Sequence, residues 1–422
     1  MTRLQSTILR DAAAAVLRRN DRGRIIAAVP DPSRNYRWHR ASILVVAGLA
    51  RTDLRRAMAE LDGLLAAQWR TGMLPLCVFD DPGIGWGFDP RRWSTTAYAK
   101  HPDPAPTSGL AALPGQPIAA RMILERGRDN GGAEMDLAEE YVANVFDVLL
   151  AAHRWTVTHR DPDGVGLVEI HHPWESMFAA CPRWDAPLSR TGPHPGASRA
   201  EREWYLLDRM HAVGWDETAV REVAEFRVRD VLASALLAGS AEVLAELADE
   251  VGRTEVAEEL EQDAARFRAG IAATIDPRTG LARDYDVRAG VWLDQVTIAG
   301  FAPLIAGGDV DVLAAQRAIL LGDDWMGHPV LRHPLPPTVS PSHPEFRRRE
   351  RWRGPVSPWM VLALVWAATR DGAWDLRAVL RDAALEMLGD HSFAEFYEPI
   401  TGEPIGPRDH SWTASVTLDL LG

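Results

Sequence analysis

Apolar residues recur at helical spacing along most of this chain. Where hydrophobic positions follow one another every three to four residues, one face of an α-helix is apolar and packs against a core. The residues between Ser42 and Gln68 carry this pattern across two helices, with a break near Arg51–Asp53, where Thr52 or Asp53 is suited to cap the second helix. The same pattern predicts helices over residues 4–19, 117–127, 134–154, 199–213, 224–251, 254–273, 309–320, 357–370, 373–388 and 411–421. Strand patterns are few and short, such as residues 290–296, so we expect an all-α protein.

The segments between the predicted helices differ strongly in length. Three of them, 77–115, 156–198 and 322–356, are long and rich in Pro, Gly, Trp, His and Asp. Loops this long in a compact domain usually have a function, and helix pairs closed into a ring would gather them around a pocket on one face. Helix pairs recur at roughly 40–60 residues, which fits a ring of six pairs. No linker divides the chain, so we predict a single domain over residues 1–422.

Composition narrows the classes of function. Lys and Arg number 46 against 59 Asp and Glu, a net charge of −13 without a basic stripe, so we expect no nucleic acid partner. No apolar run reaches about 18 residues, and charges interrupt the N-terminal stretch, so we expect no membrane span, no signal peptide and a cytoplasmic location. Cys77 and Cys181 form no metal-binding motif. The expected ligand is a small-molecule substrate, with no cofactor and no metal, bound by a monomer or homodimer.

Five segments carry a specific family pattern. In chain order they are QWRTGMLPLCVF (68–79), HPWESMFAACPRWD (172–185), FRVRDVLASALLAGSAEVLAELADEVG (226–252), WRGPVSPWMVLAL (352–364) and FAEFYEPITGEPIGPRDHSWTASVTLDLL (393–421). Together they resemble glycoside hydrolase family 63, particularly its bacterial members that hydrolyse glucosylglycerate and mannosylglycerate, with the trehalases of family 37 as more distant relatives. The resemblance implies an (α/α)6 barrel, a toroid of six helical hairpins with its long loops on one face. It also implies an inverting mechanism, in which one carboxyl group protonates the leaving oxygen and another activates water.

The resemblance assigns the base but finds the acid missing. The Glu of the family's F-x-E-Y-Y motif corresponds to Glu395. The family's catalytic Asp corresponds to Ala179, and an alanine cannot donate a proton. Glu175 and Asp185 are the other catalytic candidates, although active members of the family carry both of them alongside the acid, which favours structural roles.

Other polar positions of the family pattern are also replaced. A Trp-Asp pair corresponds to Arg40-Ala41, a His to Leu76 and an Asn to Val361, while Met177 replaces a Gly. The replacements are mostly small or apolar, which indicates a pocket for a less polar molecule than a sugar. The candidates for substrate binding are Tyr36, Trp38, Trp174, Phe178, Ala179, Trp352, Arg353, Tyr397 and Trp412.

Three functional hypotheses follow. The first is an enzyme repurposed for the cyclisation, isomerisation or elimination of an apolar small molecule, such as a terpenoid or polyketide intermediate, because apolar surroundings would raise the pKa of Glu395 and let it act as acid and base. The second is an inverting glycoside hydrolase with a displaced acid, acting on a small glycoside such as a glycosylglycerate. The third is a binding protein without catalysis. The run Arg347–Arg351 is typical of a solvated charged segment, with an anion clamp as the alternative.

Overall fold

The computed structural model describes the chain except residues 1, 32–33, 35, 80–89, 103–105 and 113. Helices dominate the described part, as expected. They are α1 (Arg3–Asn20), α2 (His39–Ala50), α3 (Leu54–Leu65), α4 (Pro90–Trp93), α5 (Gln116–Asn130), α6 (Gly132–Arg160), α7 (Asp185–Ser189), α8 (Arg199–Ala212), α9 (Glu217–Val223), α10 (Val231–Glu250), α11 (Thr254–Ala272), α12 (Ala302–Ala306), α13 (Val310–Leu321), α14 (Pro358–Arg370), α15 (Trp374–Leu388) and α16 (Ser411–Leu421). Short 3-10 turns lie at Thr95–Ala97, Pro173–Glu175, Pro182–Trp184 and Ile298–Phe301.

The predicted helices are present, with shifted ends. The break between α2 and α3 falls where expected, and the Asp53 carboxylate caps α3 by accepting a hydrogen bond from the Arg56 backbone N–H at 3.0 Å. The helix expected over 224–251 begins only at Val231, because residues 228–230 form a strand. The Asp230 side chain then caps α10 by accepting from the Leu232 and Ala233 N–H groups.

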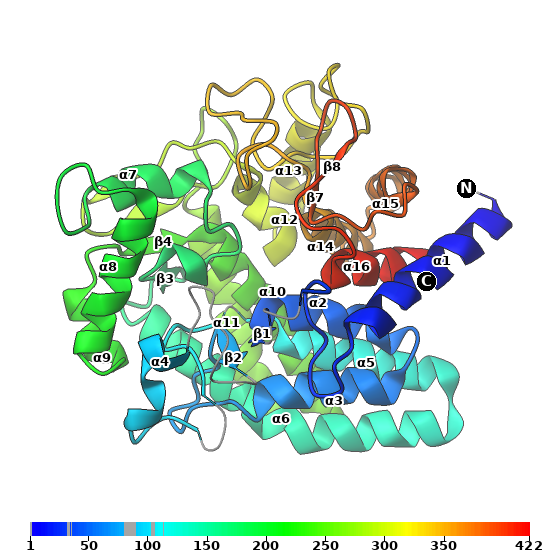
Figure 1. The fold of residues 1–422 in the computed structure, drawn as a ribbon, viewed down its shortest axis with the longest axis horizontal. Helices are drawn as coiled ribbons and strands as arrows, with labels where there is room; N and C mark the ends of the chain where they lie inside the picture. Colours follow the sequence, from blue (N-terminus) through cyan, green and yellow to red (C-terminus); the bar gives the residue numbers. More distant parts are fainter. Residues whose placement is uncertain (1, 32–33, 35, 80–89, 103–105, 113) are drawn as a thin grey trace.

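The helices contact one another in a closed order. Helix α2 packs on α5, α5 on α10, α10 on α12, α12 on α14, α14 on α16, and α16 on α2 again (Figure 1). Helices α10 and α16 are buried on most of their faces. A second set packs against these: α1 on α16, α3 and α6 on α5, α11 on α10, α13 on α12 and α15 on α14. Helix α11 buries a single stripe, as expected of a helix with one face toward solvent.

Short strands precede several helices of the closed order. Strand β1 (Tyr36–Trp38) pairs with β2 (Cys77–Phe79) and leads directly into α2. Strands β3 (Val168–Ile170), β4 (Val228–Asp230), β5 (Tyr285–Asp286) and β6 (Val291–Trp292) form an antiparallel sheet in that order, and β4 leads into α10. Strand β7 (Phe396–Tyr397) pairs with β8 (Pro404–Ile405). The predicted strand at 290–296 is therefore reduced to β6.

The sequence was expected to contain no stretch apolar enough to cross a membrane, and this expectation needs correction. By length and composition, helix α10 is apolar enough to do so. However, 72% of that stretch is buried inside the protein, as in the core helix of a globular fold. The helix is therefore only weak evidence for a membrane span.

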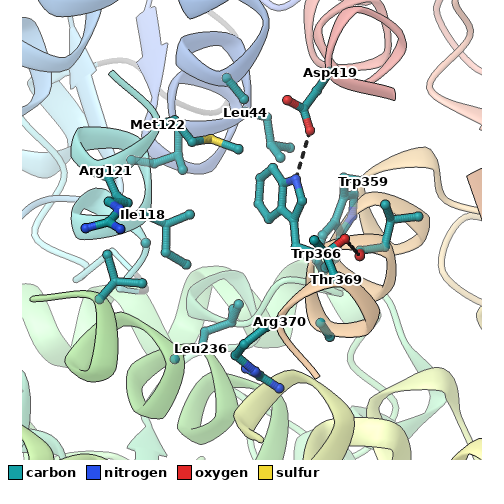
Figure 2. A pocket seen from close by; sticks show the side chains of 18 of the residues that line it. Leu44, Ile118, Arg121, Met122, Leu236, Trp359, Trp366, Thr369, Arg370 and Asp419 are labelled. Carbon is teal, nitrogen blue, oxygen red and sulfur yellow. Dashed lines mark hydrogen bonds between the residues drawn. The ribbon is translucent and has the colours of Figure 1, made fainter. Parts of the chain in front are cut away.

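A cavity of about 500 Å³ lies among the helices of the closed order. Its walls come from α2, α5, α10, α12, α14, α15 and α16. Figure 2 shows the apolar side chains around it, which include Leu44, Ile118, Met122, Leu236, Trp359 and Trp366. Glu395 is not among its lining residues.

Candidate active site

Glu395 lies directly before β7, in a loop held by the β7–β8 pairing. Its side chain is buried, with a residue exposure of 6%, and Oε1 accepts a hydrogen bond from Arg351 Nη2 at 2.6 Å. Gly406 follows β8 with a φ of +81°, and a Cβ there would stand 3.1 Å from Glu395 Oε2. A glycine is therefore required beside the carboxylate, both for the backbone conformation and for the space.

Burial raises the pKa of Glu395 above its usual value. Three guanidinium groups, those of Arg351, Arg34 and Arg40, act in the opposite direction and partly offset the effect of burial. Arg40 is half-buried, and desolvation together with the charge of Arg351 lowers its pKa to about 9. The surroundings of Glu395 therefore combine burial with nearby positive charge.

Arg351 was not expected at this site. Its guanidinium lies 5.4 Å from the ring of Trp352 and 5.8 Å from the ring of Phe396, while it binds Glu395. Arg351 is exposed over 57% of its side chain, as predicted for a solvated charged run, yet it also binds Glu395. Arg349 forms an exposed ion pair with Glu403.

Four of the predicted aromatic residues lie in this region. Trp352 packs edge-on against Phe178 with 5.0 Å between ring centroids, and it also packs against Phe396 next to Glu395. Tyr36 and Trp38 pack on each other at 6.2 Å, and Arg40 lies 4.9 Å from the ring of Trp38. Burial raises the pKa of Tyr36 to about 12, while the nearby Arg351 acts against this shift.

Ala179 lies on the loop that resembles the family's acid segment. Its carbonyl oxygen accepts a hydrogen bond from Arg199 Nη2 at 2.5 Å. The Asp185 carboxylate accepts from both Arg199 (3.0 Å) and Arg353 (2.5 Å). Both contacts are charge-assisted hydrogen bonds from guanidinium groups. The predicted residues Asp185 and Arg353 therefore form an ion pair with each other.

Glu175 is fully engaged in the same loop. Its carboxylate, 3% exposed, accepts from Arg160 at 2.7 and 3.1 Å and from the backbone N–H groups of His171, His172 and Ala111. Five hydrogen bonds from one cation and three amides hold it as an anion. Glu175 therefore has a structural position, as its presence in active family members suggested.

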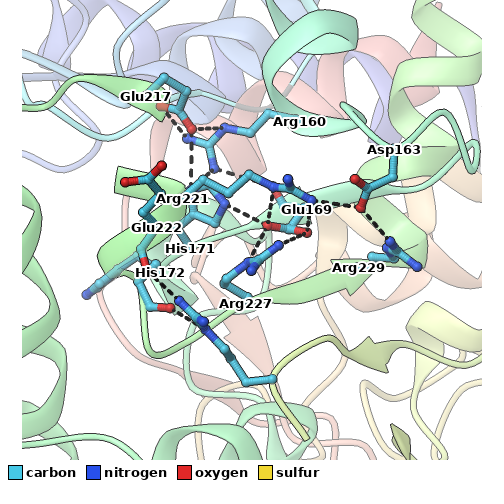
Figure 3. A network of polar contacts seen from close by, with 12 residues as sticks. Arg160, Asp163, Glu169, His171, His172, Glu217, Arg221, Glu222, Arg227 and Arg229 are labelled. Carbon is cyan, nitrogen blue, oxygen red and sulfur yellow. Dashed lines mark hydrogen bonds and ion pairs between the residues drawn. The ribbon is translucent and has the colours of Figure 1, made fainter. Parts of the chain in front are cut away.

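A buried polar network supports this loop from behind (Figure 3). Arg160 also pairs with Glu217 at 3.0 Å, and Glu217 lies 3.3 Å from His171 Nδ1. His171 Nε2 meets Glu169, which binds Arg227 at 2.7 Å. The network joins α6, β3, α9 and the segment before β4, so it fixes the start of the HPWES segment.

Of three predicted binding residues, two use their polar atoms in hydrogen bonds within the protein, and one has a donor without a partner in the described part of the chain. Trp174 Nε1 donates to Glu203 at 2.9 Å. The Tyr397 hydroxyl lies 3.2 Å from Ser392 Oγ and accepts from the Ala394 N–H, and burial raises its pKa. Trp412 stacks on His410 at 4.2 Å, and its Nε1 is a buried donor without a partner in the described part of the chain. Of the three, only Trp412 has a hydrogen-bond donor left for a ligand.

Metal binding has no obvious location in the described residues. No group of three His, Cys, Asp or Glu side chains is arranged there in a way that would hold an ion.

The comparisons with known proteins place this helical protein in the class of glycoside hydrolases and identify its family. The model of the "Mannosylglycerate hydrolase MGH1-like glycoside hydrolase domain" matches residues 34–413, so the chain belongs to that family. A glucosylglycerate hydrolase of Mycolicibacterium hassiacum is 38% identical over 99% of this chain and 98% of its own length. A mannosylglycerate hydrolase of Thermus thermophilus is 32% identical over 96% and 99%.

Solved structures agree with this assignment. A family 63 mannosylglycerate hydrolase of Thermus thermophilus in complex with Tris superposes with a TM-score of 0.87 at 30% identity, covering 97% of this chain and 99% of that one. The same enzyme has been crystallised with Tris and D-glycerate, and with glucose. The neutral trehalase Nth1 of Saccharomyces cerevisiae, at 14% identity and a TM-score of 0.57, shares the fold alone. The resemblance to family 63 is therefore confirmed.

The hypothesis of a non-hydrolytic cyclase, isomerase or lyase is wrong. The relatives that match the chain over nearly its whole length are hydrolases of glycosylglycerates. The hypothesis rested on apolar surroundings for Glu395, whereas Arg351, Arg40 and Arg34 add positive charge beside it.

Proposed function

We propose that the protein is a glycoside hydrolase on an (α/α)6 barrel that acts on a small glycoside with a carboxylate in its aglycone, of the glycosylglycerate type. The observation that carries the proposal is the set of three guanidinium groups around one buried carboxylate, Glu395. Guanidinium groups bind carboxylates through paired, charge-assisted hydrogen bonds. A glycerate carboxylate has this chemistry, and the names of the relatives contain it.

Glu395 is the base in the proposed reaction. It takes a proton from water as the water oxygen forms a bond to the anomeric carbon, on the face opposite the leaving oxygen. The bond from carbon to the leaving oxygen breaks, and its electron pair stays on that oxygen. The oxygen then needs a proton, which Ala179 cannot supply and which we do not expect from Glu175 and Asp185, both of them paired with arginines. Solvent therefore supplies the proton, and natural glycosides react slowly.

Restoring the acid tests this mechanism. A general acid contributes about 10²–10⁴-fold to the rate, so Ala179→Asp is expected to raise kcat for glucosylglycerate or mannosylglycerate by about that factor. Ala179→Asn has the same size without an acidic proton and is expected to stay at the wild-type rate. Adding Glu395→Gln to Ala179→Asp is expected to abolish the gain.

Glycosyl fluorides test the base separately, since fluoride leaves with little help from an acid. Wild type is expected to release fluoride from α-glucosyl or α-mannosyl fluoride, and Glu395→Gln is not. If wild type and Ala179→Asp both fail on fluorides and on glycerate glycosides, hydrolysis is refuted.

The alanine at position 179, where the family has its acid, favours a second candidate function. In that case the protein binds a glycerate glycoside without hydrolysing it. Calorimetric titration distinguishes the two, because this candidate predicts saturable binding by both wild type and Ala179→Asp with no product from either.

A further inference from the structure

The central cavity is open at the end away from the strands. At its inner end it is bounded by His39, Met177 and Trp359, all of them buried. At the other end it is bounded by Glu125 and Glu246, whose side chains are 60% and 52% exposed. The inner end belongs to the first turns of α2 and α14, and the open end to the later turns of α5 and α10. The cavity therefore opens where these helices end.

The cavity is long and apolar. It follows α2 from His39 to Arg51, and a helix of that length rises about 18 Å. Leu44, Ile118, Met122 and Leu236 project toward it in Figure 2. Trp366 is held at the wall by a hydrogen bond from Nε1 to Asp419 at 2.8 Å. These walls match an unbranched hydrocarbon chain and offer little to the hydroxyl groups of a sugar.

Gly239 indicates that the cavity does not result from imperfect packing of the helices. It lies in the middle of α10, where glycine is less favourable for the helix than alanine. A Cβ at this position would meet a single neighbour, the Ile305 carbonyl oxygen, at 3.6 Å. No close approach of another helix therefore requires the glycine, and its missing side chain widens the cavity that it lines.

One arginine at the open end of the cavity has no carboxylate partner in the described part of the chain, unlike the others named here. Arg121 pairs with Glu125 and Glu246, and Arg51 pairs with Asp419. The carbonyl groups that end two helices are also satisfied, because Arg370 donates to Leu304 and Ile305 of α12 and Arg381 donates to Leu420 of α16. Arg377 has no carboxylate partner in the described part of the chain and donates only to Thr369 Oγ1, at 3.1 Å.

We propose that this cavity binds a single-chain anionic amphiphile of the fatty-acid class, with its hydrocarbon chain between the helices and its carboxylate on Arg377. The site lies outside the proposed hydrolytic site and goes beyond the proposed function, and no bond is made or broken in it. Arg40 marks the boundary between the two, since it lines the inner end of the cavity and its charge acts on Glu395.

Calorimetric titration of the delipidated full-length protein with dodecanoate, below its critical micelle concentration, tests the proposal. Wild type and Gly239→Ala are expected to bind one equivalent. Gly239→Phe fills the cavity and is expected to abolish binding, with circular dichroism to verify its fold. Ala363→Leu, on α14, narrows the same cavity if the first variant does not fold. Absence of saturable binding by wild type, or equal binding by the folded cavity-filling variant, overturns the proposal.

The head group is tested with matched ligands. Arg377→Gln is expected to weaken dodecanoate about tenfold, as for a lost charge-assisted hydrogen bond, and to leave dodecanol unchanged. Dodecyltrimethylammonium is expected to bind more weakly than dodecanoate. If the cationic ligand binds more tightly instead, the assignment of an anionic ligand is overturned. Fluoride release by Gly239→Phe reports on the Glu395 site independently, so the two proposals can fail separately.

Discussion

Arg351 is a charged partner of Glu395 that opposes the effect of burial on its carboxylate. Its Nη2 lies 2.6 Å from Glu395 Oε1, although its own side chain is 57% exposed. An exposed cation can leave a carboxylate at little cost when a substrate enters. While it is present, Arg351 favours the ionised form of Glu395, the form that the proposed base needs in order to accept a proton from water.

Removing Arg351 is expected to shift the pH profile. Because its charge lowers the pKa of Glu395 against the effect of burial, Arg351→Gln is expected to raise that pKa further and to move the acidic limb of kcat/KM for a glycosyl fluoride to higher pH. Arg349→Gln removes an exposed charge from the same segment, paired with Glu403, and is the matched control. An unchanged acidic limb in Arg351→Gln would show that Arg351 does not act on the base.

At this scale the sequence singled out Glu395, the proposed base, and aromatic residues in its region, but not the arginines beside it. Glu395 was identified through a motif, and Ala179 through the register of the same alignment. In the sequence, Arg351 was one of several arginines expected to be solvated. Arg40 was noted only because Arg40-Ala41 stands where the family has a Trp-Asp pair. Which arginine turns inward depends on the loop backbone, including the positive φ of +64° at Trp352. Residue pattern does not specify that conformation.

At the scale of elements, the loop that carries Glu175 is held by the network around Glu169. This carboxylate is 2% exposed and contacts Arg227, Arg221 and His171. Burial alone would raise the pKa of Glu169, but its hydrogen bonds to His171 and Arg227 outweigh burial and lower it. The network therefore stabilises the folded state above the ordinary carboxylate pKa of 4.5, and this contribution is lost as the pH falls below it.

Glu169→Gln is expected to lower the free energy of unfolding by about 3–5 kcal/mol at pH 7, because it removes the buried carboxylate that Arg227, Arg221 and His171 share. Glu259→Gln breaks an exposed pair with Arg154 and is expected to cost less than about 1 kcal/mol. Urea denaturation at pH 7 and pH 4 provides the measurement. The difference between wild type and Glu169→Gln should be smaller at pH 4, and a constant difference would contradict the assigned role.

Helices were predicted well and strands poorly, for a physical reason. Helix α11 repeats its buried stripe at five positions, so the period is visible in the sequence. Strands β5 and β6 have two residues each, too few to show an alternation. Strand β6 pairs with β5 nearby, but the pairing of β5 with β4 depends on contacts between segments far apart in the chain. The sheet that positions the start of α10 was therefore not predictable from local pattern.

At the scale of the whole molecule, the closed order of helices joins the two ends of the chain. Helix α2 packs on α16, and α1 packs on α16 as well. The cavity between the helices is a property of this closure, because its walls come from seven helices spread over nearly the whole chain. The sequence indicated a ring of helix pairs with a pocket among its long loops. It did not indicate this cavity between the helices, since the cavity depends on the side chains left out at positions such as Gly239.

Two glycines in this set of helices lead to opposite predictions. At Gly48 in α2, a Cβ would stand 2.5 Å from Ser415 Cα in α16, whereas at Gly239 in α10 the space is open. Gly48→Ala is therefore expected to force α2 and α16 apart and to lower the free energy of unfolding by about 1–3 kcal/mol. Gly239→Ala is expected to raise it by about 0.5–1 kcal/mol, through helix propensity alone. Both are measured by urea denaturation. Equal stability of the two variants would mean that α2 and α16 do not meet at Gly48, and the closed order of helices would lose its tightest contact between the two ends of the chain.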